Sequence, residues 1–277
     1  IKMGIIKNPI LISLLKILEY ISYLSADACI GLAPGICKSI KKYRYDKDQI
    51  YFLPNGCDLN LFTFNNIKKD KKELLINGIK SNDFVAVFTG AHGDANGLIS
   101  VIKAAEKLNE FGRNDIKILF IGEGKSKEKL INYAKTKNLN NCFFLRSMPK
   151  YKLAEILNNF ADVGLMVLKN VPSFYNGTSP NKFFDYISSG LPVINNYPGW
   201  LASLIKDNNI GKVVNPDDST DFANALIFFA DNKELRDKMG YNARDLAEKR
   251  FSRNQISKKF VRVIECTYER TKKRSLF

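Results

Sequence analysis

Hydrophobic and polar residues follow two periods in the central part of the chain. Apolar runs of strand length recur, and helix-spaced apolar residues lie between them, as at Leu98, Val101, Ile102, Ala105 and Leu108. Strands that alternate with helices in this way build a parallel sheet with helices on both faces. The predicted strands are 84–89, 116–121, 142–145, 163–167, 192–195 and 211–214, and the predicted helices include 98–108, 150–159, 181–189 and 200–206.

The two ends of the chain are predicted to be largely helical. Residues 9–24 form an amphipathic helix that is too short to span a membrane and is interrupted by Lys16 and Glu19. We expect the last helix, around 256–264, to pack on this apolar stripe. The charged run 67–73 predicts a linker or an exposed helix start. Further strands are predicted at 28–30 and 50–53, and further helices from Pro34 and around 222–229 and 235–250.

Composition indicates a folded protein with an attraction to anionic partners. Of 277 residues, 45% are hydrophobic and 26% are charged, and the formal net charge is +15. The basic residues are scattered, and no helix-turn-helix, RRM or zinc-finger pattern occurs, so nucleic-acid binding is not predicted. The cysteines are odd in number and form no C-x-x-C pair, which favours buried thiols in a reducing compartment over disulfides or zinc. They are Cys29, Cys37, Cys57, Cys142 and Cys266.

The most informative stretch is 175–195 (YNGTSPNKFFDYISSGLPVIN), where a loop of small residues runs into a helix and then into an apolar strand. Such a loop brings backbone amides close to an anion, and the positive end of the helix dipole favours phosphate. Lys182 adds a positive charge, and Asp185, three residues on, suits sugar hydroxyls. The alternative for Lys182 is an ordinary surface lysine, and the alternative for Asp185 is an ordinary salt bridge on the helix surface. The loop and the helix start comprise Gly177, Thr178, Ser179, Pro180 and Asn181.

Glycine-rich turns follow the first two strands of the predicted sheet. Parallel sheets bind ligands at the carboxyl ends of their strands, so these turns are expected to line one cleft. A tight turn without a ligand is the alternative for the first of them. His92, the only histidine, is expected to face ligand, with a structural role as the alternative; a metal site with several histidines is excluded. The glycines are Gly90, Gly93 and Gly97 in the first turn and Gly122 and Gly124 in the second.

Four segments together resemble a known family. In their order and spacing, they are similar to the donor-binding half of GT4-type glycosyltransferases with the GT-B fold. The likeness is greatest to bacterial enzymes that add N-acetylated amino sugars such as N-acetyl-fucosamine. The segments are 53–58 (LPNGCD), 90–98 (GAHGDANGL), 122–130 (GEGKSKEKL) and 179–194 (SPNKFFDYISSGLPVI).

The resemblance implies roles for particular residues. Ala91 and Asn96 stand where the family usually has an Arg and a Lys against the donor diphosphate, which leaves Lys182 and His92 as the catalytic candidates. Gly177 replaces the first of the two family glutamates, and Asp185 takes the place of the second, which holds the ribose. No metal and no cofactor is implied. The implied donor-binding residues are Gly90, Gly93, Asn96, Gly97, Gly122, Gly124, Arg146, Met148, Gly177, Thr178, Ser179, Pro180, Asn181 and Asp185.

The resemblance also implies a domain order and an activity. Residues 1–60 would be the end of an acceptor-binding domain, with the hinge, in an N-terminally truncated chain. Residues 61–255 would be a Rossmann-like donor-binding domain, and 256–277 a helix that crosses back. The implied activity is retaining transfer of a sugar from a UDP-sugar to a lipid-linked glycan in O-antigen or capsule assembly, at the cytoplasmic face of an anionic membrane. The alternatives are a UDP-sugar-binding fragment without turnover, a nucleotide-sugar 2-epimerase, and a basic surface-binding protein without sugar chemistry.

Overall fold

The computed structural model describes residues 6–64, 76 and 78–274 of the chain. The predicted charged linker at 67–73 therefore lies outside the described residues. The chain forms two compact units. Unit 1 consists of Ile1–Gly56, Val171–Ser179 and Arg253–Phe277, and unit 2 consists of Cys57–Asn170 and Pro180–Ser252.

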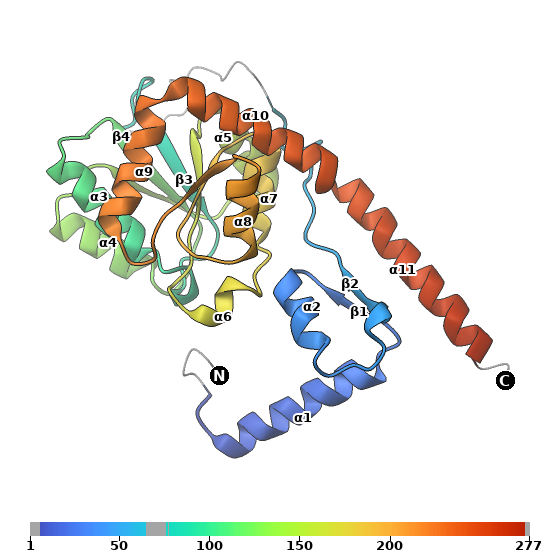
Figure 1. Ribbon diagram of the computed structural model, residues 1–277. Helices are drawn as coiled ribbons and strands as arrows, with labels where there is room; N and C mark the ends of the chain where they lie inside the picture. Colours follow the sequence, from blue (N-terminus) through green and yellow to red (C-terminus); the bar gives the residue numbers. More distant parts are fainter. Residues whose placement is uncertain (1–5, 65–75, 77, 275–277) are drawn as a thin grey trace. The chain divides into compact units, whose positions relative to one another are not determined.

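Unit 2 contains a six-stranded sheet in the order β5-β4-β3-β6-β7-β8 (Figure 1). Every neighbouring pair of strands is parallel, so all the strands end at the same edge. The mixed α/β fold with a parallel sheet is the predicted one. The strands are β3 (Phe84–Thr89), β4 (Ile116–Ile121), β5 (Cys142–Leu145), β6 (Val163–Met166), β7 (Val193–Asn195) and β8 (Gly211–Val213).

Helices cover both faces of this sheet. On one face, α3, α4 and α9 bury their apolar stripes against Ala86 and Phe88 of β3 and the matching positions of β4 and β6. Val85 and Val87 are also fully buried and, by strand alternation, point to the opposite face, where α7 packs. The helices of unit 2 are α3 (Ile99–Glu110), α4 (Lys127–Thr136), α5 (Lys150–Asn159), α7 (Asn181–Ser188), α8 (Trp200–Asp207), α9 (Ser219–Asp231), α10 (Lys233–Arg250) and the short η3 (Asp94–Asn96).

Unit 1 is built on two parallel strands, β1 (Cys29–Gly31) and β2 (Ile50–Phe52). The prediction that the last helix covers the first one is wrong. Helix α1 has no buried residue, and Ile10 and Ile21 are 79% and 53% exposed. Figure 1 shows α2, β1 and β2 between α1 and α11, and Arg270 of α11 donates instead to the Asp27 carbonyl beyond the end of α1 (2.7 Å). The helices of unit 1 are α1 (Pro9–Ser25), α2 (Pro34–Ile40), η1 (Lys47–Gln49), α6 (Pro172–Tyr175) and α11 (Arg253–Arg274).

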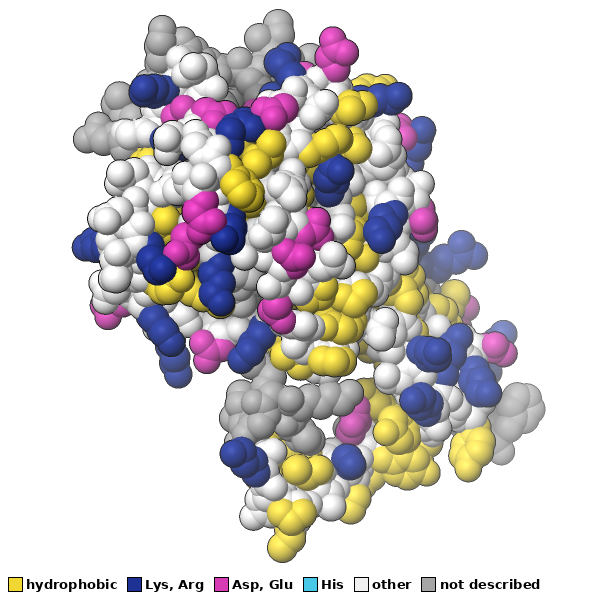
Figure 2. Space-filling view, turned by 60° about the vertical axis from the view of Figure 1, so that its left-hand side comes forward, with side chains coloured by type: hydrophobic (Ala, Val, Ile, Leu, Met, Phe, Trp, Pro, Cys, Tyr) yellow, Lys and Arg dark blue, Asp and Glu magenta, His cyan; other side chains and the backbone are white. Residues whose placement is uncertain are grey.

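Charged side chains are spread over the surface. Figure 2 shows basic and acidic side chains interspersed on the face that it draws, as the scattered sequence positions predicted. Among the described residues, no helix combines the length and the apolar character needed to cross a membrane. All five cysteines are free thiols; Cys37 and Cys57 are buried, but Cys266 is exposed, contrary to the expectation of buried thiols.

Candidate functional site

The strand order of unit 2 places a crevice between β3 and β6. From β3 the chain continues to β4 and β5 on one side, whereas β6 leads to β7 and β8 on the other side. The connections after β3 and β6 therefore leave in opposite directions at the carboxyl edge of the sheet. Open parallel sheets bind their ligands at such a switch point.

The glycine turns after β3 and β4 are joined by their backbones beyond the ends of the strands. The amides of Gly90 and His92 donate to the carbonyls of Ile121 (3.0 Å) and Glu123 (2.8 Å). A Cβ on Gly122 would lie 1.9 Å from the Gly90 carbonyl oxygen, and one on Gly124 would lie 2.6 Å from that of His92. Both glycines also have positive φ angles, of 149° and 155°. Glycine is therefore required at these two positions by the backbone packing itself.

The same turn meets the end of β6 across the crevice. The Lys169 amide donates to the Ala95 carbonyl (2.9 Å). Gly97 is left-handed (φ 57°), and a Cβ on it would lie 2.8 Å from the Lys169 backbone. For Gly93, in contrast, no atom of the described residues lies within 4 Å of its Cβ position, so a side chain fits there.

Tyr186 fixes the position of helix α7 over the crevice. Its ring packs where Gly164 of β6 has no side chain, since a Cβ on Gly164 would lie 2.4 Å from the ring. The Tyr186 hydroxyl accepts from the Thr89 amide at the end of β3 (2.9 Å). Sequence reasoning missed this contact, although a glycine inside an apolar strand is a signal of close approach by another group.

Lys182, in the first turn of α7, reaches back to the turn after β3. Its Nζ donates to Asn96 Oδ1 (2.8 Å) and lies 4.0 Å from the centroid of the Phe88 ring. A Cβ on Gly90 would lie 3.6 Å from the same nitrogen. Burial lowers the pKa of Lys182 to about 7. The structure thus brings three of the predicted residues together, with an ammonium group at the switch point.

Asp185, one turn further along α7, has a different partner. Its Oδ1 lies 3.2 Å from Nζ of Lys150, the first residue of α5. The Asp185 side chain is buried and that of Lys150 is partly exposed. The salt bridge that was the alternative for Asp185 is therefore present.

The expectation that His92 faces a ligand is wrong. Its side chain is fully buried, with its ring centroid 5.9 Å from that of Phe88 and 6.4 Å from that of Phe144. Burial, assisted by the positive charge of Lys127, lowers its pKa to about 4. Within the described part of the chain, neither ring nitrogen has a hydrogen-bond partner. The imidazole points into the aromatic core because its backbone is fixed by the neighbouring turn, and a catalytic role for it stays a prediction without structural support.

The turn after β4 is closed by Lys127, which sequence reasoning also missed. Its Nζ donates to the carbonyls of Gly122 and Leu145, both at 2.8 Å, and to Glu123 Oε1 at 2.9 Å. Glu123 is therefore an ion-pair partner of Lys127, and it is exposed. Of the predicted donor-binding residues, Arg146 is exposed and Met148 is partly buried in the loop after β5.

The loop of small residues before α7 belongs to unit 1. Asn55 Nδ2 donates to the Ser179 carbonyl, and the Thr178 hydroxyl donates to the Phe174 carbonyl (3.0 Å). A Cβ on Gly177 would meet its nearest atoms at 3.7 and 4.0 Å, so this position has room for a side chain. Pro180 is the N-cap of α7 and Asn181 its first residue, and no side chain among the described residues caps this helix start.

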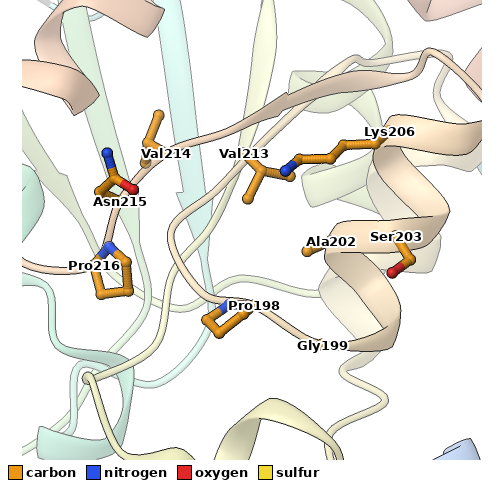
Figure 3. Close-up of a pocket in the computed structure, with 9 residues that line it drawn as sticks. All are labelled: Pro198, Gly199, Ala202, Ser203, Lys206, Val213, Val214, Asn215 and Pro216. Carbon is orange, nitrogen blue, oxygen red and sulfur yellow. The ribbon is translucent and has the colours of Figure 1, made fainter.

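A separate cavity of about 330 Å³ lies beside α8, at the ends of β7 and β8 (Figure 3). Lys206 reaches across it toward Val213. None of the residues predicted from the sequence lines this cavity, so it contributes nothing to the candidate site. Its walls are Pro198, Gly199, Ala202, Ser203, Lys206, Val213, Val214, Asn215 and Pro216.

The fold and the glycine turns define a Rossmann-like α/β unit, and a family model specifies it further. The chain matches the model of the glycosyl transferases group 1 over residues 69–246. It therefore belongs to this family, the GT4-type glycosyltransferases with the GT-B fold. Among the described residues, no group of three or more His, Cys, Asp or Glu side chains is arranged to hold a metal ion.

Individual relatives resemble the chain over part of their length. It is 28% identical over 198 residues to the UDP-Gal:alpha-D-GlcNAc-diphosphoundecaprenol alpha-1,3-galactosyltransferase of Escherichia coli, covering 71% of this chain and 49% of that one. The crystal structure of WaaG, a glycosyltransferase involved in lipopolysaccharide biosynthesis, superposes with a TM-score of 0.67 at 20% identity, over 83% of this chain and 60% of WaaG. Anabaena HepE, solved with UDP and glucose, gives a TM-score of 0.72 at 16% identity, over 87% and 64%. The chain thus spans about half the length of the curated relative.

Proposed function

We propose that this chain carries the donor-binding part of a retaining glycosyltransferase. The donor is a UDP-sugar, and the sugar moved is an N-acetylated amino sugar. The acceptor is a lipid-linked glycan at the cytoplasmic face of an anionic membrane, in the assembly of a surface polysaccharide such as O-antigen or capsule. The galactosyltransferase relative, named for a UDP-sugar donor and a diphosphoundecaprenol-linked acceptor, supports the proposed substrate classes.

One observation carries the proposal, namely the position of Lys182. Its ammonium lies at the switch point beside the joined glycine turns, bonded to Asn96 Oδ1 at 2.8 Å. A diphosphate placed there meets backbone amides, helix N-termini and one positive charge. As the bond to the sugar breaks, negative charge grows on the departing diphosphate. A fixed donor in that position contributes on the order of 2 to 4 kcal/mol to catalysis.

Isothermal titration calorimetry with UDP tests this assignment. Lys182→Met is expected to weaken UDP binding about 10- to 100-fold, since a hydrogen bond from a charged group to phosphate is lost. Lys212→Met is a matched control, because Lys212 also lies over a phenyl ring, 3.8 Å from the centroid of Phe228, but comes from β8. Equal UDP affinity in the Lys182→Met variant and the unmodified protein contradicts the proposal.

The alternatives differ in their support. A 2-epimerase needs acid-base side chains in the cleft, and the only histidine is buried away from it. Donor binding without turnover is compatible with the position of Lys182 beside the glycine turns. Hydrolysis or transfer measured with a UDP-sugar, beside the calorimetry, distinguishes binding alone from catalysis.

A further inference from the structure

The amide side chain of Asn96 is held between a backbone carbonyl and the ammonium of Lys182. Its Nδ2 donates to the Ala91 carbonyl (2.7 Å), and its Oδ1 accepts from Lys182 Nζ (2.8 Å). All three residues belong to unit 2. The reversed amide would place its NH2 group against an ammonium and its oxygen against a carbonyl, which are two unfavourable contacts. The two neighbours therefore fix which end of the amide faces Lys182.

The backbone around Asn96 is held by bonds that do not involve its side chain. The Asn96 amide donates to the Gly93 carbonyl (3.1 Å). The Lys169 amide, just beyond β6, donates to the Ala95 carbonyl (2.9 Å). A substitution at Asn96 can therefore remove the side-chain contacts while the turn keeps these backbone bonds.

The ammonium of Lys182 is bonded but not neutralised. Asn96 is an uncharged acceptor, and no carboxylate of the described residues forms an ion pair with Lys182. The Phe88 ring, with its centroid 4.0 Å away, adds a cation–π contact. An ammonium has three donors, so the bond to Asn96 leaves two of them for an anion. A carboxylate in place of the amide would also hold the lysine, but it would cancel the charge that attracts an anion.

We infer that Asn96 is a positioning residue, which holds the Lys182 ammonium toward the donor diphosphate through an uncharged hydrogen-bond acceptor and does not itself contact the diphosphate. This inference rests on the proposed function and replaces the direct donor contact predicted for Asn96 from the sequence. A hydrogen bond to the charged form of an amine favours that form. Without Asn96, Lys182 is therefore expected to be less well oriented and to release its proton at lower pH.

The elements around Lys182 carry other charged or titratable groups. The carboxylates have polar partners of their own: Asp94 is bonded to Ser126 Oγ (3.0 Å), Glu123 to Lys127 Nζ (2.9 Å), and Asp185 is ion-paired with Lys150 (3.2 Å). Burial, with the positive charge of Lys127, lowers the pKa of His92 to about 4, and burial raises the pKa of Tyr186. The Lys169 side chain is exposed. A transition in UDP binding close to neutral pH is therefore assigned to Lys182.

UDP calorimetry over a range from about pH 6 to pH 9 tests the inference in the full chain. Asn96→Leu is expected to weaken UDP binding about 10-fold at neutral pH and to move the midpoint of the pH dependence down by about one pH unit. Asn96→Asp is also expected to weaken binding, because its carboxylate neutralises the ammonium, but to move the midpoint to higher pH. A side chain that only supported the fold would move neither midpoint.

A double variant separates positioning from direct contact. If Asn96 acts through Lys182, Asn96→Leu is expected to change UDP affinity by less than about 3-fold in the Lys182→Met background, where the ammonium is absent. Asn208→Leu is the matched control, because Asn208 Nδ2 also donates to a backbone carbonyl, that of Leu204 at 2.8 Å. This variant is expected to keep both the affinity and the midpoint of the unmodified protein.

The outcomes separate this inference from the proposed function. If the unmodified protein does not bind UDP, the proposed function fails, and the inference with it. If Lys182→Met weakens UDP binding but Asn96→Leu leaves the affinity or the midpoint unchanged, the inference is overturned while the proposed function stands. An equal loss from Asn96→Leu in both backgrounds also overturns it, because that result shows direct contact with the nucleotide. Thermal unfolding of each variant shows that folded proteins are compared.

Discussion

The turn at Gly122–Gly124 and the loop at Gly177–Ser179 look alike in the sequence but differ in the structure. In the first, a Cβ on Gly122 would lie 1.9 Å from a carbonyl oxygen, whereas in the second the nearest atom to a Cβ on Gly177 is 3.7 Å away. Glycine is thus required by crowding and a positive φ in one place and is merely present in the other. A small residue near a predicted phosphate site does not by itself show that the backbone approaches anything closely.

Replacing one glycine by alanine in each region tests most directly whether the two regions differ in their need for glycine. Gly122→Ala is expected to lower the free energy of unfolding by about 3 kcal/mol, or the midpoint of thermal unfolding by about 6 to 12 °C, because the turn after β3 must move. The same movement displaces Gly90 and so weakens UDP binding. Calorimetry and thermal unfolding measure the two effects.

Gly177→Ala is the counterpart of that variant, with an expected change within about 0.5 kcal/mol. Gly93→Ala controls for substitution within the turn after β3 itself, since its Cβ position has nothing within 4 Å. Equal losses of stability in the Gly122→Ala and Gly177→Ala variants would remove the distinction between the two regions.

A smaller effect is expected from the charge of Lys182, which follows the loop at Gly177–Ser179, on the pH dependence of UDP binding. Because the pKa of Lys182 is lowered to about 7, the free protein loses this ammonium as the pH rises, and a bound diphosphate restores it. UDP affinity is expected to fall about 15-fold from pH 7.0 to 8.5, and binding takes up a proton. Titrations in buffers of different ionisation enthalpy measure that uptake.

The Lys182→Met variant is expected to show only a flat pH dependence over this range. As the pH rises, Lys182 is expected to increase the stability of the folded protein, whereas it decreases the affinity for UDP. Between pH 7 and the ordinary pKa of 10.5, the unfolded chain binds the proton that the folded protein has lost, so this group makes the protein more stable as the pH rises. A steep loss of affinity in the Lys182→Met variant would assign the titration to another group.

The smallest expected effect is at His92, in the turn joined to Gly122–Gly124. His92→Leu removes two buried ring nitrogens without partners among the described residues and is expected to raise stability by about 1 kcal/mol, with UDP affinity unchanged within about 2-fold. With a pKa of about 4, His92 costs stability as the pH falls from 6.5 to 4, since only the unfolded chain is protonated there. In urea unfolding, the variant is expected to lose this pH dependence of stability. A large loss of UDP affinity in the variant would instead show that His92 takes part in UDP binding.

The regular part of the fold was predictable because its signal is local. The strands Phe84–Thr89 and Ile116–Ile121 were predicted with their observed bounds, since short apolar runs flanked by turn residues are typical of buried strands. Helix α4 was not predicted, because its buried face consists only of Leu130 and Ala134 in a lysine-rich segment. The packing of the last helix on α1 was inferred from a resemblance and depends on contacts between distant segments, which periodicity does not encode.

The site was predictable as a set of turns but not as a set of contacts. Lys182 and Gly90 were selected from the residue types that phosphate requires, and the structure brings them together. The direction of the His92 side chain depends on the hydrogen bond between its amide and Glu123, which joins two separate turns. Lys150, which forms an ion pair with Asp185, is on a helix that follows another strand, so no spacing in the sequence shows this contact.

Helix α1 has a practical consequence for anyone who prepares this polypeptide. Ile10, Leu14 and Ile21 are each more than half exposed, and water around such surface is energetically unfavourable. Sulfate and other strongly hydrated salts increase that penalty, so precipitation with ammonium sulfate should begin at low saturation. Mild detergent should keep the preparation dispersed, and a low-salt buffer is the better choice for titrations.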